Sequence, residues 1–284
     1  MNIFNTRIFI VVLSLIVSVA ATAKTTIDGI CYELDSENLK ATVTYLGEYT
    51  PIGSESPLNP KPKYTASSID IPSEVTYNNK TYKVTAISPD AFYNCSEVKS
   101  IKIPNTVSFI GKNAFGYCTN LTSINIPTSV KKIETATFGD CQSLTSITIS
   151  EGVTTISEQA FASCESLTSI VLPSTITFIS PQSFLGCNGL KSVTVKSPTP
   201  IALYNGTFEV FGELHVPAGS KDAYSKSPIW KNFTIIEDTE TTGIANVPTS
   251  ITQHLTPVFD LSGHSLTAPR KGVNIINGKK VVIK

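Results

Sequence analysis

Cysteine is the residue type in this sequence with the widest choice of chemistry, because a thiol can form a disulfide, bind a metal or attack a substrate. Five of the six cysteines recur every 23 residues: Cys95, Cys118, Cys141, Cys164 and Cys187. A repeat of fixed length places them in one straight column, which cannot surround a zinc ion tetrahedrally. Neighbouring cysteines could come within bridging distance, but pairing along the column would leave one thiol out. We therefore predict a reduced, buried structural column, while the sequence leaves the redox state of Cys31 open.

The other residues that could do chemistry do not form a catalytic or metal-binding pattern. The three histidines, His215, His254 and His264, lie outside the cysteine column. No serine, histidine and acid arrangement recurs, so nucleophilic catalysis has no support. Several acidic residues fall at turn positions of the repeat, where we expect them to be solvated: Glu134, Asp140, Glu151, Glu158 and Glu165. The sequence therefore predicts no catalytic residue, no metal and no cofactor, in a protein that is not an enzyme.

The cysteines belong to a longer unit whose other positions recur with the same period. A phenylalanine stands three residues before each one: Phe92, Phe115, Phe138, Phe161 and Phe184. An aliphatic residue stands three residues after: Val98, Leu121, Leu144, Leu167 and Leu190. A serine comes two residues later, at Ser100, Ser123, Ser146, Ser169 and Ser192, and opens a short strand pattern. A period in the twenties means that each unit must stack on copies of itself, which predicts a repeat solenoid.

One unit shows how the strand half of the repeat should be built. Leu121, Ile124 and Ile126 follow the leucine-rich-repeat spacing, and alternation along the strand sends both isoleucines inward. Asn125 then points outward, and Pro127 ends the strand because it has no N–H to donate. Stacking such strands predicts a leucine-rich repeat with one parallel β-sheet.

The other half of the unit returns the chain to the next strand. Val130 and Ile133 should point into the core from a turning segment, and residues 134–138 are predicted to form a short helical turn. A parallel β-helix is the rival fold, because its coils have a similar length. The Ala-Phe-x-x-Cys element is more typical of a helical turn than of a strand, which favours the leucine-rich-repeat form.

The two ends of the repeat region differ from its middle, as capping units should. Residues 24–68 are predicted to form an N-terminal β cap, and an insertion in the first unit has a hairpin tip at Asn78-Asn79-Lys80. The solenoid itself covers residues 69–236, as five regular units and a degenerate capping unit. In that last unit Ser220 is a candidate N-cap of a short helix, and Trp230 supplies apolar surface that seals the final rung.

The best candidate for function is the outward side of the predicted sheet, because solenoids present broad curved surfaces to partners. The candidate interaction face consists of two files of side chains: Lys102, Asn125, Thr148, Val171 and Thr194, and beside them Lys99, Thr122, Thr145, Thr168 and Lys191. The alternative is that these are merely solvated residues that favour β-strands and bind no partner. Few aromatic residues occur on this side, which weakens a sugar-stacking platform.

Residues 1–23 are predicted to be a signal peptide. Arg7 precedes an apolar stretch over residues 8–19, and Ala21-Thr22-Ala23 offers small residues for cleavage. The stretch is shorter than the roughly 18 apolar residues that a membrane span needs, so we expect no span after cleavage. Arginine occurs only at Arg7 and Arg270 and the formal net charge is zero, which argues against nucleic-acid binding. We predict a secreted or cell-surface protein.

The repeated units of the form I-x-I-P-x-x-V-x-x-I-x-x-x-A-F-x-x-C-x-x-L-x-S resemble the BspA-like leucine-rich repeats over residues 69–236. The closing segment 214–224, with Trp230 and Phe233, is similar to the terminal cap of that family. The resemblance implies an exported repeat protein of host-associated bacteria or protists, some relatives of which bind host or matrix proteins. It implies no catalytic residue.

The C-terminal tail is predicted to be separate from the solenoid. Residues 237–256 are polar and rich in turn residues, as in a linker. Residues 257–284 give short strands separated by glycine turns. This segment resembles the C-terminal sorting segment of type IX secretion cargo, and a structural remnant without a sorting role is the alternative.

The sequence as a whole predicts an exported or cell-surface protein that mediates protein–protein interaction or adhesion without catalysis. Its partner would be an extracellular protein. One alternative is a glycan-binding surface protein, which an exposed aromatic pair at one end of the sheet would favour. A less favoured alternative is a β-helical polysaccharide-degrading enzyme, which three outward acids close together on adjacent rungs would support.

Overall fold

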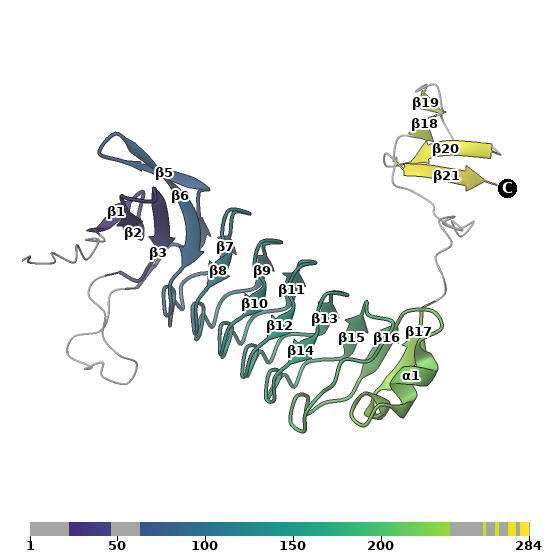
Figure 1. Ribbon diagram of the computed structural model, residues 1–284. Coiled ribbons are helices and arrows are strands. Elements are labelled where there is room, and N and C mark those ends of the chain that lie inside the picture. Colours follow the sequence, from purple (N-terminus) through teal and green to yellow (C-terminus); the bar gives the residue numbers. More distant parts are fainter. Residues whose placement is uncertain are drawn as a thin grey trace, which may run out of the picture.

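The computed structural model describes residues 23–46 and 63–238, and the backbone of four short strands between residues 258 and 283. Residues 1–22 of the predicted signal peptide and most of the predicted linker lie outside these residues. The chain between the two ends is a solenoid of stacked rungs (Figure 1). The predicted repeat solenoid is therefore confirmed.

One side of the solenoid carries two four-stranded parallel sheets, built from one strand of each rung, which together we call the main sheet. Its first half has the order β4 (Ser68–Asp70), β7 (Ser100–Lys102), β9 (Ser123–Ile126), β11 (Ser146–Ile149). Its second half has the order β13 (Ser169–Leu172), β15 (Ser192–Val195), β16 (Glu213–Val216), β17 (Thr234–Glu237). Strands β11 and β13 are neighbours, and equivalent residues pair without a register shift, as in Ser146 opposite Ser123. The alternation predicted for Ile124, Asn125 and Ile126 is confirmed, because only Asn125 is exposed.

A second file of parallel strands, which the sequence did not predict, lies on the return half of the rungs. It contains β8 (Phe109–Ile110), β10 (Lys132–Ile133), β12 (Thr155–Ile156) and β14 (Phe178–Ile179). The pairs β10–β12 and β12–β14 are in register, and β8 pairs with β6 of the cap. Ile133 points inward as predicted, but its segment is extended rather than turning. Hydrogen bonds join β10, β12 and β14 from rung to rung, for example from the Ser157 N–H to the Ile133 carbonyl and from the Ser180 N–H to the Ile156 carbonyl, both at 2.9 Å.

The helical turn predicted over residues 134–138 is wrong in detail, because the structure has tight turns there instead. Ala136 and Asp140 adopt left-handed φ angles of 51° and 58°, which interrupt any helix. Their N–H groups are turned toward the next rung, and the Asp140 N–H donates to the Ala162 carbonyl at 2.8 Å. The same two positions are left-handed in the other regular rungs: Asp90 and Asn94, Asn113 and Tyr117, Gln159 and Ser163, Gln182 and Gly186. Most are not glycine, so the pattern leaves no simple sequence signal.

A continuous stack of phenylalanine rings fills the interior behind the sheet. Ring centroids from Phe92 to Phe184 are 5.3–5.5 Å apart with nearly parallel planes, and Phe208 continues the stack at 4.8 Å. All six rings are buried. Each buried ring stabilises the fold by about 1.5–3 kcal/mol, but only because the neighbouring rung covers it.

The cysteine column runs beside the ring stack, and all six cysteines of the chain are buried and outside any disulfide. The Cys118 thiol donates a hydrogen bond of 3.1 Å to the Phe92 carbonyl of the preceding rung. The equivalent bonds from Cys141, Cys164 and Cys187 are 3.2, 3.2 and 3.0 Å long. Burial raises the pKa of Cys141 to about 12, so its reactive thiolate form is suppressed.

The N-terminal cap extends the solenoid with an antiparallel sheet. Strands β1 (Ala23–Ile27), β2 (Ile30–Asp35) and β3 (Lys40–Val43) pair antiparallel, and β3 then runs parallel to β6 (Lys80–Ile87). The predicted hairpin tip is confirmed between β5 (Glu74–Tyr77) and β6. Its two turn residues, Asn78 and Asn79, have φ angles of 48° and 60°, as this kind of tight hairpin requires.

Tyr64 joins this cap to the first regular rung. Its ring lies 4.7 Å from that of Phe92, at the start of the phenylalanine stack. Its hydroxyl donates to the Thr44 carbonyl at 2.6 Å and accepts from the Cys31 N–H at 3.0 Å. Tyr64 stands outside the 23-residue period, so no signal in the sequence singled it out.

The C-terminal cap consists of α1 (Lys221–Lys226), a short 3₁₀ turn η1 (Trp230–Asn232) and β17. The predicted sealing residue Trp230 is fully buried, and its indole N–H donates to the Ile201 carbonyl at 2.7 Å. Ser220 stands at the helix N-cap as predicted, but its side chain makes no capping hydrogen bond. The Glu237 carboxylate instead accepts from the Lys221 N–H at 3.1 Å.

The tail contains the short strands predicted for it. They are β18 (Val258–Phe259), β19 (Ser265–Leu266), β20 (Gly272–Ile276) and β21 (Lys279–Ile283), in an antiparallel sheet of order β19-β18-β20-β21. A sorting role for this segment stays a prediction. In the described part of the chain, no helix has the length and apolar character to cross a membrane.

Candidate functional site

The predicted interaction face lies on the outside of the main sheet. Of its ten residues, nine are exposed and Thr194 is half-buried. We call this surface the outer sheet face. Its function stays a prediction, but the structure gives the two files of side chains different roles.

The file that precedes the strands is partly used to hold the rungs together. The Thr122 hydroxyl donates to the Lys99 carbonyl at 3.1 Å, and the Thr145 hydroxyl donates to the Thr122 carbonyl at the same distance. Each of these threonines therefore bonds the backbone of the preceding rung. Their hydroxyl donors are already occupied, so they are poorer candidates for ligand recognition.

The file within the strands lines a shallow depression. This hollow has a volume of about 380 Å³ and spans β4, β7, β9 and β11. Its polar lining consists of Ser68, Asp70, Ser100, Lys102, Ser123, Asn125, Ser146 and Thr148. Three of these, Lys102, Asn125 and Thr148, were predicted as interaction residues.

The serines at the strand starts are the members of this lining that the sequence did not point to. A serine occupies that position in every regular unit, and a side chain that does not vary favours a structural role over ligand recognition. Ser123 and Ser146 are exposed, and the Ser100 hydroxyl donates only to the Ser68 hydroxyl at 3.0 Å. The burial of the flanking isoleucines sets the serines outward, which places a row of small hydroxyls along the hollow.

One ion pair on this side of the molecule is solvated. Lys102 contacts Asp70 at 3.1 Å, with 75% and 66% of the two side chains exposed. An ion pair so accessible to water contributes little to stability, so both groups can be redirected to a partner at small cost.

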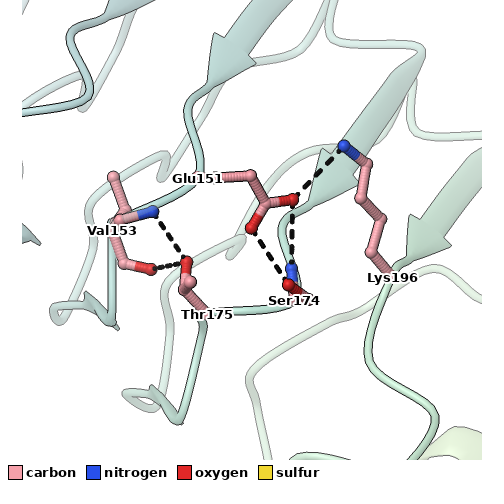
Figure 2. A network of polar contacts seen from close by, with 6 residues as sticks. Glu151, Val153, Ser174, Thr175 and Lys196 are labelled. Carbon is pink, nitrogen blue, oxygen red and sulfur yellow. Dashed lines mark hydrogen bonds and ion pairs between the residues drawn. The ribbon is translucent and has the colours of Figure 1, made fainter.

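A larger polar network lies on the loops that follow β11, β13 and β15 (Figure 2). Glu151 accepts from the Ser174 hydroxyl at 3.1 Å and contacts Lys196 at 3.4 Å. Desolvation alone would raise the pKa of Glu151, but the hydrogen bonds from Ser174 and Lys196 together hold it below its ordinary value. Each partner comes from a different rung, so the network ties three rungs together along one edge of the sheet.

The residues considered for catalysis do not converge. Glu134 contacts Lys132 at 2.8 Å, whereas His215 lies between Glu213 and Asp238 at 3.5 and 3.4 Å. Within residues 23–46 and 63–238, no three His, Cys, Asp or Glu side chains are close enough to hold a metal ion. His254 and His264 lie outside the described residues.

One pair of exposed aromatic side chains lies away from the outer sheet face. Phe178 of β14 and Tyr204 form a pair with ring centroids 5.8 Å apart, and both are exposed. This pair lies at the last rung of the second strand file rather than on the main sheet. Tyr117 is also exposed, and the carboxylate of Asp140 raises its pKa.

These features define the class of the protein: a leucine-rich-repeat solenoid with a main sheet of parallel strands. The more specific assignment comes from a family comparison, in which residues 85–209 match the BspA type Leucine rich repeat region in six copies. This part of the chain is therefore a leucine-rich repeat region of the BspA type. Proteins with such repeats are usually interaction or surface proteins.

Solved structures agree with this fold. A leucine-rich repeat protein from Bacteroides ovatus is 29% identical, with a TM-score of 0.52 over 68% of this chain. This chain spans 49% of the B. ovatus structure. The Treponema pallidum leucine-rich repeat protein TpLRR is 23% identical, with a TM-score of 0.51 over 69% of this chain and 87% of its own. A search of curated proteins found no significant match.

Proposed function

We propose that this protein is exported and binds another extracellular protein through the outer sheet face, without catalysis. One observation supports this above the others. The solenoid holds a row of exposed, short polar side chains in register over four strands, around a hollow of about 380 Å³. The backbone beneath them is fixed by the rung-to-rung hydrogen bonds, so the surface is preorganised for a partner.

The character of the surface favours many modest contacts over a single deep pocket. Hydroxyls of Ser123, Ser146 and Thr148 and the amide of Asn125 can each donate and accept hydrogen bonds. The Lys102–Asp70 pair supplies one charge of each sign, so a partner with complementary charges would be oriented on the sheet. Recognition of this kind suits the side of another protein better than a small reacting molecule.

The binding site can be tested by replacing Lys102, Asn125 and Thr148 together with alanine. Mature protein on a surface would first be exposed to matrix and mucin extracts, and each captured protein then purified and titrated. We expect the triple variant to lose at least about tenfold in affinity, since a few lost polar contacts are worth about 1.4 kcal/mol or more. Alanine at Lys132 and Thr155, which lie on the second strand file, is the matched control. Equal binding by the triple variant would contradict the proposal.

Export is supported by the signal-peptide pattern of residues 1–23 and can be tested separately. We expect the protein recovered from the source cells to begin at Lys24, as measured by mass spectrometry of the intact chain. The same mass reports whether residues 257–284 remain after export. Recovery of the full chain from the cell interior, beginning at Met1 or at Asn2 after removal of Met1, would contradict export.

A further inference from the structure

The rung that carries Phe208 and ends in β16 is shorter than the regular rungs at one place. Ser192 comes eight positions after Phe184 in a regular rung, whereas the equivalent Glu213 comes only five positions after Phe208. Phe208 is still stacked on Phe184, and Glu213 is still paired with Ser192. The missing three residues therefore come from the turn that carries the cysteine and leucine in every regular rung.

This deletion coincides with a depression at the C-terminal end of the main sheet, which we call the end pocket. It has a volume of about 640 Å³ and is lined by Asn188, Leu190, Lys191, Val210, Phe211, Gly212, Glu213 and Thr234. The first three belong to the last regular rung, whose turn has no full-length successor to cover it. The end pocket is thus a consequence of the broken period.

Phe211 gives this pocket an aromatic wall. Its register position is that of Leu190, which is buried, yet Phe211 is 40% exposed. It packs edge-to-face on Phe233, with the ring centroids 5.1 Å apart. The ring is held in place on one side while the rest remains open to the pocket.

The floor of the pocket is rigid. Gly212 lies so close to the preceding rung that an added Cβ would be 2.0 Å from the Lys191 carbonyl oxygen. That oxygen accepts from the Glu213 N–H at 2.8 Å, and the Gly212 carbonyl accepts from the Thr234 N–H at 2.9 Å. Three rungs are fixed to one another here, so the pocket is formed before any ligand arrives.

Polar groups surround the aromatic wall. Lys191 and Asn188 are exposed, and their side chains make no hydrogen bond or ion pair with other described residues. Glu213 is more than half exposed and faces His215 at 3.5 Å. An ammonium, an amide and a carboxylate therefore stand around one open aromatic ring.

We propose that the end pocket binds a pyranose unit of a glycan. The apolar C–H face of a pyranose ring suits the negative face of an aromatic ring, while its hydroxyls need donors and acceptors around the edge. Phe211 supplies the aromatic face. Asn188, Lys191 and Glu213 supply the hydrogen-bond donors and acceptors. The volume falls within the range of about 300–1,000 Å³ of ordinary small-ligand sites. A protein partner would be expected to use a larger apolar area than this single ring.

The test begins with the mature wild-type protein on a printed array of mucin-type and plant cell-wall oligosaccharides. The strongest ligand is then titrated by calorimetry. We expect Phe211→Ala to weaken binding more than tenfold and Phe211→Trp to preserve it. Asn188→Ala should weaken binding about tenfold through the loss of one or two hydrogen bonds, without touching the core.

Two controls separate this site from the rest of the molecule. Phe109→Ala removes a phenylalanine of similar exposure from the second strand file and should leave sugar binding unchanged. The triple alanine variant of the outer sheet face should also bind sugar normally, so either proposal can fail alone. The pyranose assignment is overturned if no oligosaccharide binds, if Asn188→Ala and folded Phe211→Ala both bind like wild type, or if Phe211 proves necessary only for a protein partner.

Discussion

The regular rungs and the terminal rungs of this protein cover the buried aromatic stack in different ways. In the middle, each phenylalanine is covered by its own copy from the next rung, and each cysteine thiol bonds a carbonyl one rung back. At the ends no copy is available, so single residues take over. Tyr64 closes one end of the stack, and Trp230 and Phe233 close the other.

The difference shows where such a chain is free to vary. A change inside a regular rung disturbs two neighbours at once, which keeps the interior uniform. The outward strand positions and the shortened rung that ends in β16 are not required to match the side chains of the neighbouring rungs. We infer that partners and ligands bind at these positions, where a side chain can differ from one rung to the next.

The strongest way to test the contrast is to remove a ring from the middle of the stack. Phe138 is fully buried between Phe115 and Phe161. Phe138→Ala should lower the free energy of unfolding by about 3–5 kcal/mol, because it leaves a cavity that neither neighbour can fill. Chemical denaturation measures this directly. Phe211→Ala at the exposed end should cost much less, and equal losses at both sites would break the comparison.

The second effect concerns alkaline pH. Burial raises the pKa of Cys141 from 9.0 to about 12, so folding favours the protonated thiol. The stability it contributes is present below pH 9 and is lost as the pH rises toward 12. We expect the free energy of unfolding to fall over this range, less steeply in Cys141→Ala than in wild type. The same slope in both proteins would contradict a buried thiol at this position.

A smaller and local effect is expected at the N-terminal end. Tyr64→Phe keeps the ring against Phe92 but removes the hydroxyl that bonds the Thr44 carbonyl and the Cys31 N–H. The loss should be about 1–3 kcal/mol, since two backbone groups lose a partner. Hydrogen exchange should accelerate in β2 and β3, while residues 120–195 keep their protection. Uniform acceleration along the chain would show that the cap and the regular rungs are one cooperative unit.

The smallest effect on stability is expected on the outer sheet face. Lys102→Ala removes a solvated side chain and its exposed pair with Asp70. The free energy of unfolding should change by less than about 0.5 kcal/mol. A change beyond 1 kcal/mol in thermal or chemical denaturation would indicate a structural role that argues against a surface kept for a partner.

The sequence was most informative where the chain repeats itself. The columns of Phe138 and Cys141 and the outward position of Asn125 follow from period and alternation, and the hairpin at Asn78 follows from its turn residues. It was least informative about backbone geometry. The left-handed residues Ala136 and Asp140 and the two-residue strands depend on hydrogen bonds between rungs, which no single unit displays.

The candidate site shows the same limit. Alternation along a strand was enough to place Lys102, Asn125 and Thr148 on the surface. The depression they line depends on how successive strands pack, and the end pocket depends on three absent residues after Phe208. The break in period was visible in the sequence, but the exposure of Phe211 was not, because a phenylalanine near the core period would normally be buried.

Thiol accessibility tests the stacked-rung account most directly. The mature protein would be treated with iodoacetamide at pH 8, folded and after unfolding in denaturant, and mapped by peptide mass spectrometry. The account predicts that Cys95, Cys118, Cys141, Cys164 and Cys187 stay unmodified in the folded protein and are all alkylated after unfolding without a reductant. Rapid alkylation of several of them in the folded state, or disulfides among them, would contradict it.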